Sequence, residues 1–372
     1  MNKSEKNIYY LYIIFSFLFI AVTTNYLSLN DIIFIANQTD SLSYTAIAKN
    51  APLLTGEDSF ILNNKATLIQ QHVAQRFVIP YIIGSIAHFL NINFFLIFKL
   101  FTLIFLFFYV FLINVLIKKL NFNLKVSLLF FSILFLNPYI VRYHIFQPVQ
   151  AHDMLFFCFG LLFFLTIISK NYFSNLLISI ITIYLRQTSI ALLIGSGIFL
   201  LINKKIKLFL ILFLLSFLSL FLIVKTGQLI TSDKFPINLA YGIIYYDFSQ
   251  FEKLLKFLLL GIMPFTPLFV ILFGKINRNI EIFSALILLF VCIMMIGQPI
   301  LGGPDGSVNN VGRIANLCFP ILTCFCFYVW SFEKFVNKDY FFYSFISAMF
   351  LWSLHPTYSV FKLFGVFRFY NY

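Results

Sequence analysis

The sequence has few charged residues, and this scarcity excludes a soluble globular protein. Only 10% of its 372 residues are Asp, Glu, Lys or Arg, and 61% are hydrophobic, whereas about 25% of residues are charged in soluble domains. Apolar stretches long enough for a helix to cross a bilayer, roughly 20 residues, recur from end to end. The sequence therefore predicts an all-α integral membrane protein, with residues 1–372 in one polytopic domain and no separate soluble domain.

Three further absences narrow the possible functions. The five cysteines all lie inside apolar stretches, without the polar flanks of a disulfide or the spacing of a zinc site, so we expect them to pack in helices. The net charge of +13 is not gathered into a basic block or a basic helix face, which argues against nucleic acid as a partner. No internal repeat is present, direct or inverted, which disfavours a transporter built from repeats.

Eleven apolar segments are predicted to be transmembrane helices. They lie at residues 8–27, 94–117, 124–140, 152–169, 173–185, 188–202, 206–224, 254–273, 281–298, 313–331 and 340–358. The first follows Lys3 and Lys6 and is predicted to be a retained signal anchor. Residues 77–90 are also apolar, but this segment is short and contains Pro80 and His88. We expect it to be a surface or re-entrant helix within a first outward loop over residues 28–93.

The positive residues predict the orientation of these helices. If residues 77–90 do not cross, the positive connectors all fall on one side of the membrane. They carry Lys118, Lys119, Lys125, Lys170, Lys204, Lys205, Lys207, Lys275, Arg278, Lys334 and Lys338. Short positive connectors stay in the cytoplasm, so we expect the N-terminus inside, the C-terminus outside, and the longer acid-bearing segments facing outward.

Polar motifs in the first outward loop are candidates for a functional site. Thr39-Asp40-Ser41-Leu42-Ser43-Tyr44 predicts a short helix that ends before Pro52. Asp is a good N-cap residue, so Asp40 has either a capping role or a catalytic one. The stretch Gln70-Gln71-His72-Val73-Ala74-Gln75-Arg76 then leads into the 77–90 helix. It is either a solvated surface or a polar wall over a cavity at membrane level.

The later outward segments contribute further polar residues. Arg142, His144, His152 and Asp153 lie between two predicted spans, and Asp153 opens the apolar run Met-Leu-Phe-Phe. An acid at this depth is a functional candidate by default, although it also suits the N-terminus of a helix.

Two more outward motifs carry an arginine each. Arg186-Gln187-Thr188-Ser189 divides a long apolar stretch, either as a tight turn with Arg186 extended to the interface or as part of a site. A glycine-rich segment, residues 302–312, precedes Arg313. Its glycines serve either an ordinary turn or a close approach of the backbone to a ligand.

Taken in order, these features resemble the GT-C superfamily of membrane glycosyltransferases, namely its protein O-mannosyltransferases and lipid A aminoarabinose transferases. The likeness covers roughly residues 8–170: one span, a long outward loop with an early acid, a Pro-containing helix, two spans, and an acid at the next helix start. The early acid is in a D-x-x-x-Y element, Asp40 to Tyr44. The second acid is Asp153 in Ala-His-Asp-Met-Leu.

The sequence departs from the family pattern at two places. It has Asp40-Ser41 where Asp-Glu is common, and Val78-Ile79-Pro80 where Pro-Pro is usual. The Pro-containing helix nevertheless falls in the expected place, between residues 76 and 90.

The resemblance implies a reaction of the inverting GT-C type. A sugar would pass from a polyprenyl-phosphate carrier to a lipid, glycan or protein acceptor at the outer face of a bacterial inner (plasma) membrane, facing the periplasm. Asp40 would be the base that takes the acceptor proton, and Asp153 would orient the acceptor. No cofactor is required, or a divalent cation such as Mg or Mn is held by Asp40 and Asp153.

The resemblance also implies which side chains meet the donor. The residues expected to bind its phosphate or the substrate are Tyr44, His72, Arg76, Arg142, His144, His152, Arg186 and Arg313. We expect Asp40 and Asp153 to converge. We expect Arg186 and Arg313, with Arg76, to form the phosphate site, because the guanidinium fork suits phosphate oxygens.

Two other classes of protein stay open. A lipid-linked polysaccharide polymerase or ligase also uses outward Arg and His, but typically has its large loop late in the chain, whereas here the long loop comes first. A transporter or flippase is expected to have charged residues at mid-membrane on several helices, and Lys99 is the only clear candidate.

The orientation can be tested by labelling single cysteines. Residue 60 should react with an impermeant reagent from outside and residue 120 only from inside, because the lysines near residue 120 stay in the cytoplasm. Labelling of position 120 from outside would mean that residues 77–90 cross the membrane, and every later connector would then change sides.

Overall fold

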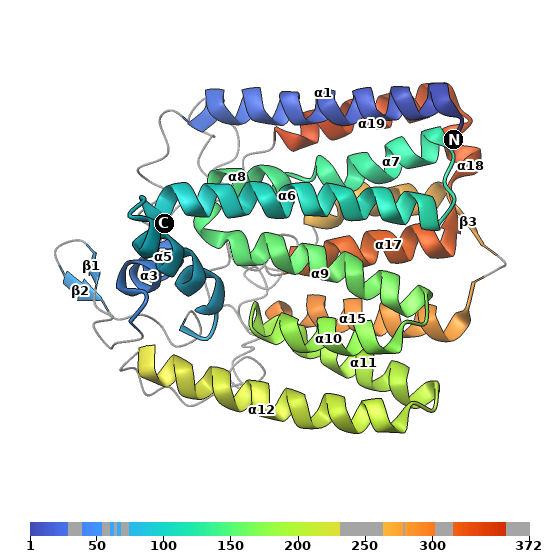
Figure 1. Cartoon of the computed structure of the whole chain (residues 1–372). Helices are drawn as coiled ribbons and strands as arrows, with labels where there is room; N and C mark the ends of the chain where they lie inside the picture. The colour runs from blue at the N-terminus through green and yellow to red at the C-terminus, as the bar shows by residue number, and fades with distance from the viewer. Residues whose placement is uncertain are drawn as a thin grey trace, which may run out of the picture. The chain divides into compact units, whose positions relative to one another are not determined.

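The computed structural model describes residues 1–28, 39–53, 60–62, 65–67, 74–230, 263–277, 280–301 and 315–354. These residues are mostly helical, in agreement with the all-α prediction (Figure 1). Four helices are long and apolar enough to cross a membrane: Lys3–Thr24, Phe94–Lys119, Pro148–Ile168 and Ile206–Ile230. A pair bent by 40°, Leu124–Phe135 with Pro138–Phe146, makes a fifth if it is one span. The chain is an α-helical membrane protein.

Helices occupy the places that the apolar segments predict, but most are shorter than a full crossing. The shorter apolar helices, of 10–17 residues, are Val78–Leu90, Tyr172–Ile183, Gln187–Ile202, Pro264–Phe273, Ile282–Gln298 and Asn316–Val329. Some of the predicted spans are interrupted at prolines, which cannot donate a backbone hydrogen bond. One example is the break before Pro138. Residues 254–262 of a predicted span lie outside the described residues.

Within the described part of the chain, four very short strands are what the all-α prediction missed. β1 (Phe60–Leu62) pairs antiparallel with β2 (Lys65–Thr67) in the segment between α3 and α5. β3 (Lys275–Ile276) pairs with β4 (Trp330–Ser331), with Lys275 opposite Ser331 and Ile276 opposite Trp330. Backbone groups outside helices need partners, and neither pair is long enough to show a periodic sequence pattern.

The described chain forms two compact units. Unit 1 comprises Met1–Asp31, Val110–Phe146 and Gly242–Tyr372, and unit 2 comprises Ile32–Tyr109 and Gln147–Tyr241. The long helix α6 (Phe94–Lys119) contributes its first part to unit 2 and its last part to unit 1.

Unit 1 is built around α7 (Leu124–Phe135), which is buried along most of its length. Around it pack α1 (Lys3–Ser28), α17 (Phe319–Val329), α18 (Glu333–Val336) and α19 (Asp339–Ser353). The other elements of unit 1 are η1 (Pro138–Arg142), α8 (Tyr143–Phe146), η5 (Met263–Phe273), α15 (Ile282–Leu301) and η6 (Asn316–Cys318).

Aromatic and hydroxyl contacts fix α1 against α7. Phe17 of α1 packs against Phe135 of α7 with ring centroids 4.6 Å apart, and Tyr12 of α1 shares a 2.6 Å hydrogen bond with Ser132 of α7. A hydrogen bond between helices is favourable where no water competes for the hydroxyl groups.

Several lysines that the sequence assigns to the cytoplasm gather at one end of unit 1. Lys125, at the start of α7, forms an ion pair with Asp339 at the start of α19. The pKa of Lys334 is lowered by a hydrogen bond and by charge repulsion from Lys275, so α18 and β3 bring these two amines together. The side of the membrane on which they lie stays a prediction.

Unit 2 consists of two groups of helices. In the first, α3 (Thr39–Asn50) packs on α5 (Val78–Leu90). In the second, α9 (Ala151–Ile168) packs on α10 (Tyr172–Ile183), and α10 packs on α11 (Ile190–Ile202) and α12 (Ile206–Ile230). The one-turn helices η2 (Pro148–Gln150) and η3 (Gln187–Ser189) precede α9 and α11.

Small polar side chains join the helices of the second group. The Asn175 amide of α10 donates to Thr166 of α9 at 2.9 Å, and Ser196 of α11 donates to the Asn175 carbonyl at 2.6 Å. All three side chains are buried. Such bonds hold apolar helices together in lipid, where burial of apolar surface provides little driving force.

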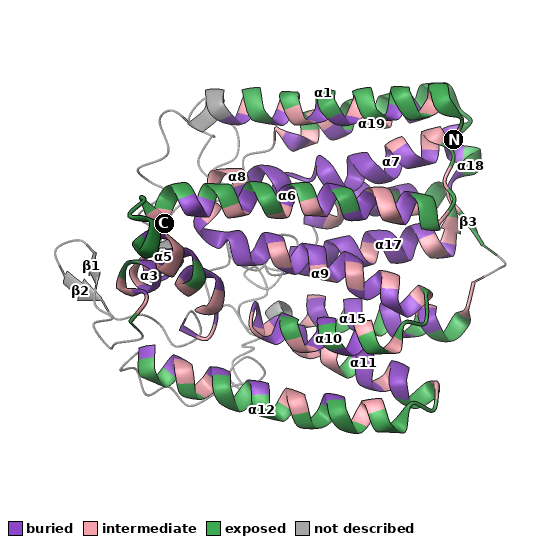
Figure 2. Ribbon diagram, in the orientation of Figure 1, coloured by how far each residue is buried: buried purple, intermediate pink, exposed green. Residues whose placement is uncertain are grey.

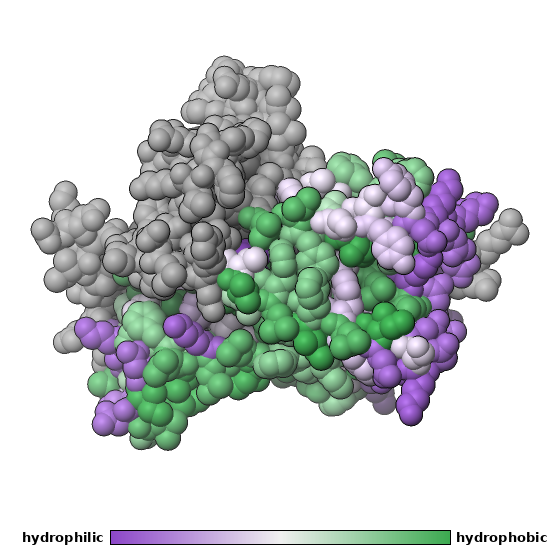
Figure 3. Space-filling model, turned by 90° about the horizontal axis from the view of Figure 1, so that it is seen from above, coloured by the Kyte–Doolittle hydropathy of each residue, from purple (hydrophilic) through white to green (hydrophobic). Residues whose placement is uncertain are grey.

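Burial separates the helices that face the surroundings from those of the core. α7 and α9 are mostly buried, whereas α1 and α12 expose one side along most of their length (Figure 2). The exposed side of α12 is formed by large apolar residues, among them Phe213, Leu214 and Phe217. Figure 3 shows hydrophobic residues over much of one face, with hydrophilic residues mostly toward its edges. These surfaces fit a lipid environment. The five cysteines are buried and unpaired, as expected.

The contact between α3 and α5 depends on a glycine. A Cβ atom added at Gly84 would lie 2.0 Å from the backbone oxygen of Ala48. We therefore expect Gly84→Ala to push α3 away from α5 and to lower the free energy of unfolding by about 1–3 kcal/mol or more. The measurement is thermal unfolding of the purified protein in detergent.

Gly297→Ala is the matched control for this substitution. Gly297 also lies in a helix, and a Cβ atom added there meets nothing within 4 Å. Alanine should therefore be neutral or slightly stabilising at this position. Equal unfolding temperatures for the two variants would contradict the close approach of α3 and α5.

Candidate functional site

A buried ion pair lies at the start of α9 in unit 2. Arg186 donates from Nε to Oδ1 of Asp153 and from Nη2 to Oδ2, so the guanidinium grips both carboxylate oxygens. Asp153 is fully buried and Arg186 is 2% exposed. A two-point pair of this kind is the strongest and most directional contact between these residue types.

The break between α10 and α11 places Arg186 beside Asp153. α10 ends at Ile183, and Arg186 has an extended backbone (φ −155°, ψ 143°) before the one-turn helix η3 begins. The backbone N–H of Arg186 still bonds to the Thr182 carbonyl at 3.1 Å. The sequence predicted this break. Of the two roles that it left open for Arg186, extension of the side chain to the membrane interface is wrong, because the side chain is buried.

His152 connects the ion pair to α3. Its Nε2 lies 3.1 Å from Oδ1 of Asp153. Its ring packs against the ring of Tyr44, with centroids 4.5 Å apart. Both side chains are buried, so the D-x-x-x-Y element of the first loop reaches the start of α9.

Arg76 and Gln187 connect Tyr44 back to Arg186. Arg76 donates from Nη1 to the Tyr44 hydroxyl at 3.1 Å and from Nε to Oε1 of Gln187 at 2.8 Å. Gln187 in turn donates to Oε1 of Gln75 at 3.0 Å. Because its oxygen accepts and its nitrogen donates, the Gln187 amide has a defined orientation.

These contacts form a circuit that closes through the backbone between the neighbours Arg186 and Gln187, and we call it the buried polar cluster. Its members are Tyr44, Gln75, Arg76, His152, Asp153, Arg186 and Gln187. They come from α3, the segment before α5, the first turn of α9 and the start of η3. Hydrogen bonds of this kind in a low-dielectric interior hold together the elements that contribute them.

The cluster unites five of the ten residues that the sequence singled out: Tyr44, Arg76, His152, Asp153 and Arg186. Asp40 is in α3, one helical turn before Tyr44, but its side chain lies outside the described residues. His72 and Arg313 also lie outside the described residues. The convergence of Asp40 with Asp153, and the role of Arg313 at a phosphate site, therefore stay predictions.

Two further predicted site residues, Arg142 and His144, belong to unit 1. Arg142 is buried in the π-helix η1, a rare form of helix that is common at functional sites, and its Nη2 donates to Thr23 at 2.7 Å. Its Nε and Nη1 have no hydrogen-bond partner among the described residues. His144 Nδ1 lies 2.5 Å from the Ile140 carbonyl. Donors of this kind suit an anion, and the binding of phosphate by Arg142 stays a prediction.

Gln75 and Gln187 lie in motifs that the sequence singled out but are not among its ten candidate site residues, and Thr23 lies in neither motif. Gln75 precedes Arg76 and Gln187 follows Arg186, so each glutamine adjoins a predicted arginine in the sequence. The position of each amide next to a candidate arginine was the feature of the sequence that could have identified these glutamines. Thr23 lies in an apolar helix and gave none.

The arrangement bears on the predicted metal site. Both oxygens of Asp153 already accept hydrogen bonds from Arg186, so this carboxylate is a poor candidate for a cation ligand. Within the described ranges, no group of three or more His, Cys, Asp or Glu side chains is placed to hold a metal. Because the Asp40 side chain is outside those ranges, the divalent cation stays a prediction.

The buried pair can be tested by a double-mutant cycle on stability. Asp153→Asn or Arg186→Gln alone leaves one buried charge without its partner and should lower the free energy of unfolding by about 3–5 kcal/mol. The double variant removes both charges and should lose less than the sum of the single losses. Thermal unfolding in detergent measures all three.

The matched control is the exposed pair Lys125–Asp339, with 35% and 68% of the side chains exposed. Lys125→Gln and Asp339→Asn should each change stability by at most about 1 kcal/mol, because solvent screens an exposed pair. Additive losses in the Asp153–Arg186 cycle would show that the two charges are not coupled.

Comparison with known proteins gives no match, since no family model, curated protein or solved structure is similar to this chain. The choice among functions therefore depends on the buried polar cluster and on the motifs that its residues belong to.

Proposed function

We propose that this chain is a GT-C-type glycosyltransferase that moves a sugar from a polyprenyl-phosphate carrier to an acceptor at the outer face of the membrane. The proposal includes eleven crossings, a bacterial inner membrane location and a periplasmic active site. The observation that carries it is the buried polar cluster. Two motifs far apart in the sequence, D-x-x-x-Y in α3 and Ala-His-Asp at the start of α9, meet in it through Tyr44 and His152.

The contacts of the cluster support different roles for the two acids, Asp40 and Asp153. A general base needs a carboxylate oxygen that faces the acceptor hydroxyl. The Asp153 oxygens face Arg186, so Asp153 is a positioning residue in this proposal. Asp40, one turn before Tyr44 on α3, is the proposed base that removes the acceptor proton as the bond from sugar to phosphate breaks.

The arginines divide in the same way. Arg186 is bound to Asp153 and stabilises the start of α9, which makes it a weaker candidate for the phosphate than the sequence indicated. Arg76 bonds to the side chains of Tyr44 and Gln187, and these bonds hold its guanidinium group beside α3. We propose that Arg76 stabilises the negative charge that develops on the leaving phosphate, as fixed donors do in other transferases.

The test is turnover of polyprenyl-phosphate-linked hexoses, labelled in the sugar, by membranes that contain the protein. Asp40→Asn removes the base and should lower turnover by roughly 10²–10⁴-fold. Arg76→Lys keeps the charge but loses the planar fork, and should lower turnover by about tenfold or more. The measurement is loss of label from the lipid fraction, normalised to the amount of protein inserted.

Asp339→Asn is the matched control for Asp40→Asn, because it makes the same chemical change at an exposed acid in unit 1. It should turn over donor at the unaltered rate. The proposal fails if Asp40→Asn matches this control, or if the unaltered protein consumes none of the labelled carriers.

A further inference from the structure

A second site lies at the opposite end of α9 from the buried polar cluster. α9 begins with the cluster residue Asp153 in its first turn and ends at Ile168. Its 18 residues span about 27 Å at 1.5 Å per residue. That distance is close to the thickness of a bilayer's hydrocarbon core, about 30 Å. The turn after α9 is therefore at the other membrane surface, which the positive connectors assign to the cytoplasm.

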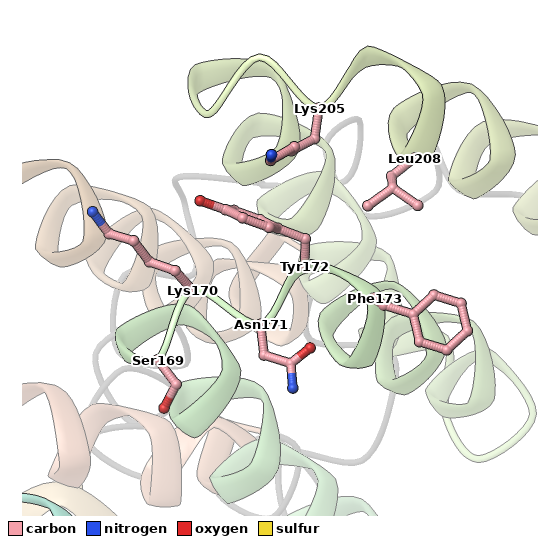
Figure 4. Close-up of a pocket in the computed structure, with 7 residues that line it drawn as sticks. All are labelled: Ser169, Lys170, Asn171, Tyr172, Phe173, Lys205 and Leu208. Carbon is pink, nitrogen blue, oxygen red and sulfur yellow. The ribbon is translucent and has the colours of Figure 1, made fainter.

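An open pocket of about 530 Å³ occupies this end of unit 2. It lies where the turn between α9 and α10 meets the start of α12. The residues that line it are Ser169, Lys170, Asn171, Tyr172, Phe173, Lys205 and Leu208 (Figure 4). We call it the lysine pocket. Figure 4 shows the Tyr172 ring between the side chains of Lys170 and Lys205.

Specific contacts hold the polar side of the lysine pocket in place. The Tyr172 hydroxyl donates to Asn203 at 3.1 Å, and the Lys205 amine lies 5.0 Å from the centre of the Tyr172 ring. Asn171 caps α10 by accepting from the Ser174 backbone N–H at 3.2 Å. The Lys205 amine thus lies against a fixed ring, and the Lys170 amine extends from the adjacent turn; both lysine residues are exposed.

The backbone at this end holds lysine where other residues are preferred. Among the described residues, four other than glycine have a positive φ: Asn91, Asn121, Lys170 and Lys204. Asparagine tolerates this left-handed conformation, but lysine has no local advantage there, and glycine is the usual residue after a helix. Both lysines lie at this end of unit 2, one in the lysine pocket and one next to its other lysine, Lys205.

The remaining side of the lysine pocket is apolar. Phe173 is 61% exposed, and Leu208 continues into the exposed apolar side of α12, which includes Ile206 and Leu210. Two amines beside an apolar wall at a membrane surface match an amphiphile with a negative headgroup. A soluble anion would use the amines but gain nothing from the apolar wall.

We propose that the lysine pocket binds the phosphate of an anionic phospholipid in the cytoplasmic leaflet, with acyl chains along α10 and α12. Lys170 and Lys205 contact the phosphate oxygens, and the Tyr172 ring separates the two amines. This site is distinct from the one that we propose for glycosyl transfer and does not depend on it. Free phosphate shares the headgroup's chemistry, and the experiment separates the two.

The experiment uses the full-length protein in detergent, titrated with phosphatidylglycerol, phosphatidylcholine or inorganic phosphate. Phosphatidylglycerol should raise the unfolding temperature in a saturable way, because a ligand of the folded state stabilises it. The other two additions should have little effect. Stabilisation by phosphatidylcholine to the same extent, or by inorganic phosphate alone, would overturn the proposal of an anionic lipid.

The matched variants are Lys170→Gly/Lys205→Gln and Lys118→Gln/Lys119→Gln. The first places glycine at a left-handed position, so it should fold at least as well as the unaltered protein there, yet it should need about tenfold more phosphatidylglycerol for half the effect. The second removes two exposed lysines from the end of α6 and should change that concentration by less than about twofold. Equal loss in both variants would indicate general surface attraction and not a pocket.

Discussion

A carboxylate and a guanidinium that are buried together must satisfy each other, because neither can be left without a partner away from water. In unit 2 this requirement falls on Asp153 and Arg186, and it organises what surrounds them. The first turn of α9 and the break before η3 are held together by two hydrogen bonds between charged groups. Tyr44, Arg76 and the two glutamines then close around the pair, which joins α3 and α5 to the helices of the second group.

A buried charged residue can have a catalytic role or a structural one, and this constraint distinguishes the two. The sequence offered Asp153 as a candidate for chemistry because acids at membrane depth are rare. In the structure its role is to hold Arg186 and His152, and so to fix the start of α9. Chemistry, in the proposal above, belongs to residues next to this fixed frame. A frame that does not move is what a reacting group needs if its geometry is to be reproducible.

The sequence was sufficient for the positions of most elements. Apolar stretches gave the places of the helices, Pro52 gave the approximate end of α3, and the polar residues 186–189 gave the break between α10 and α11. The lengths were less predictable, because a proline or a capped turn shortens a helix without changing the hydropathy around it. For this reason the described residues contain four or five helices of crossing length, where eleven spans were predicted.

The candidate site was only partly predictable. Residue type and expected depth in the membrane identified five residues of the cluster, but not which of them form hydrogen bonds with each other. These five are Tyr44, Arg76, His152, Asp153 and Arg186. The Asp153–Arg186 pair joins residues 33 positions apart, and such a pairing depends on how α9, α10 and η3 pack. Gln75 and Gln187 were missed for a related reason. A neutral amide carries no signal of its own until the charge that it bonds to has been placed.

The closed form of the buried polar cluster has a consequence for how this protein can change over generations. Each member contacts other members, and an exchange at the buried residues Arg76, Asp153 or Arg186 leaves a buried polar group unsatisfied, which costs about 1–3 kcal/mol. Most membrane-facing positions of α12 carry no such penalty, since one large apolar side chain there can replace another. Over generations, lipid-facing residues can therefore be exchanged one at a time, whereas we expect the seven cluster residues to be kept together or lost together.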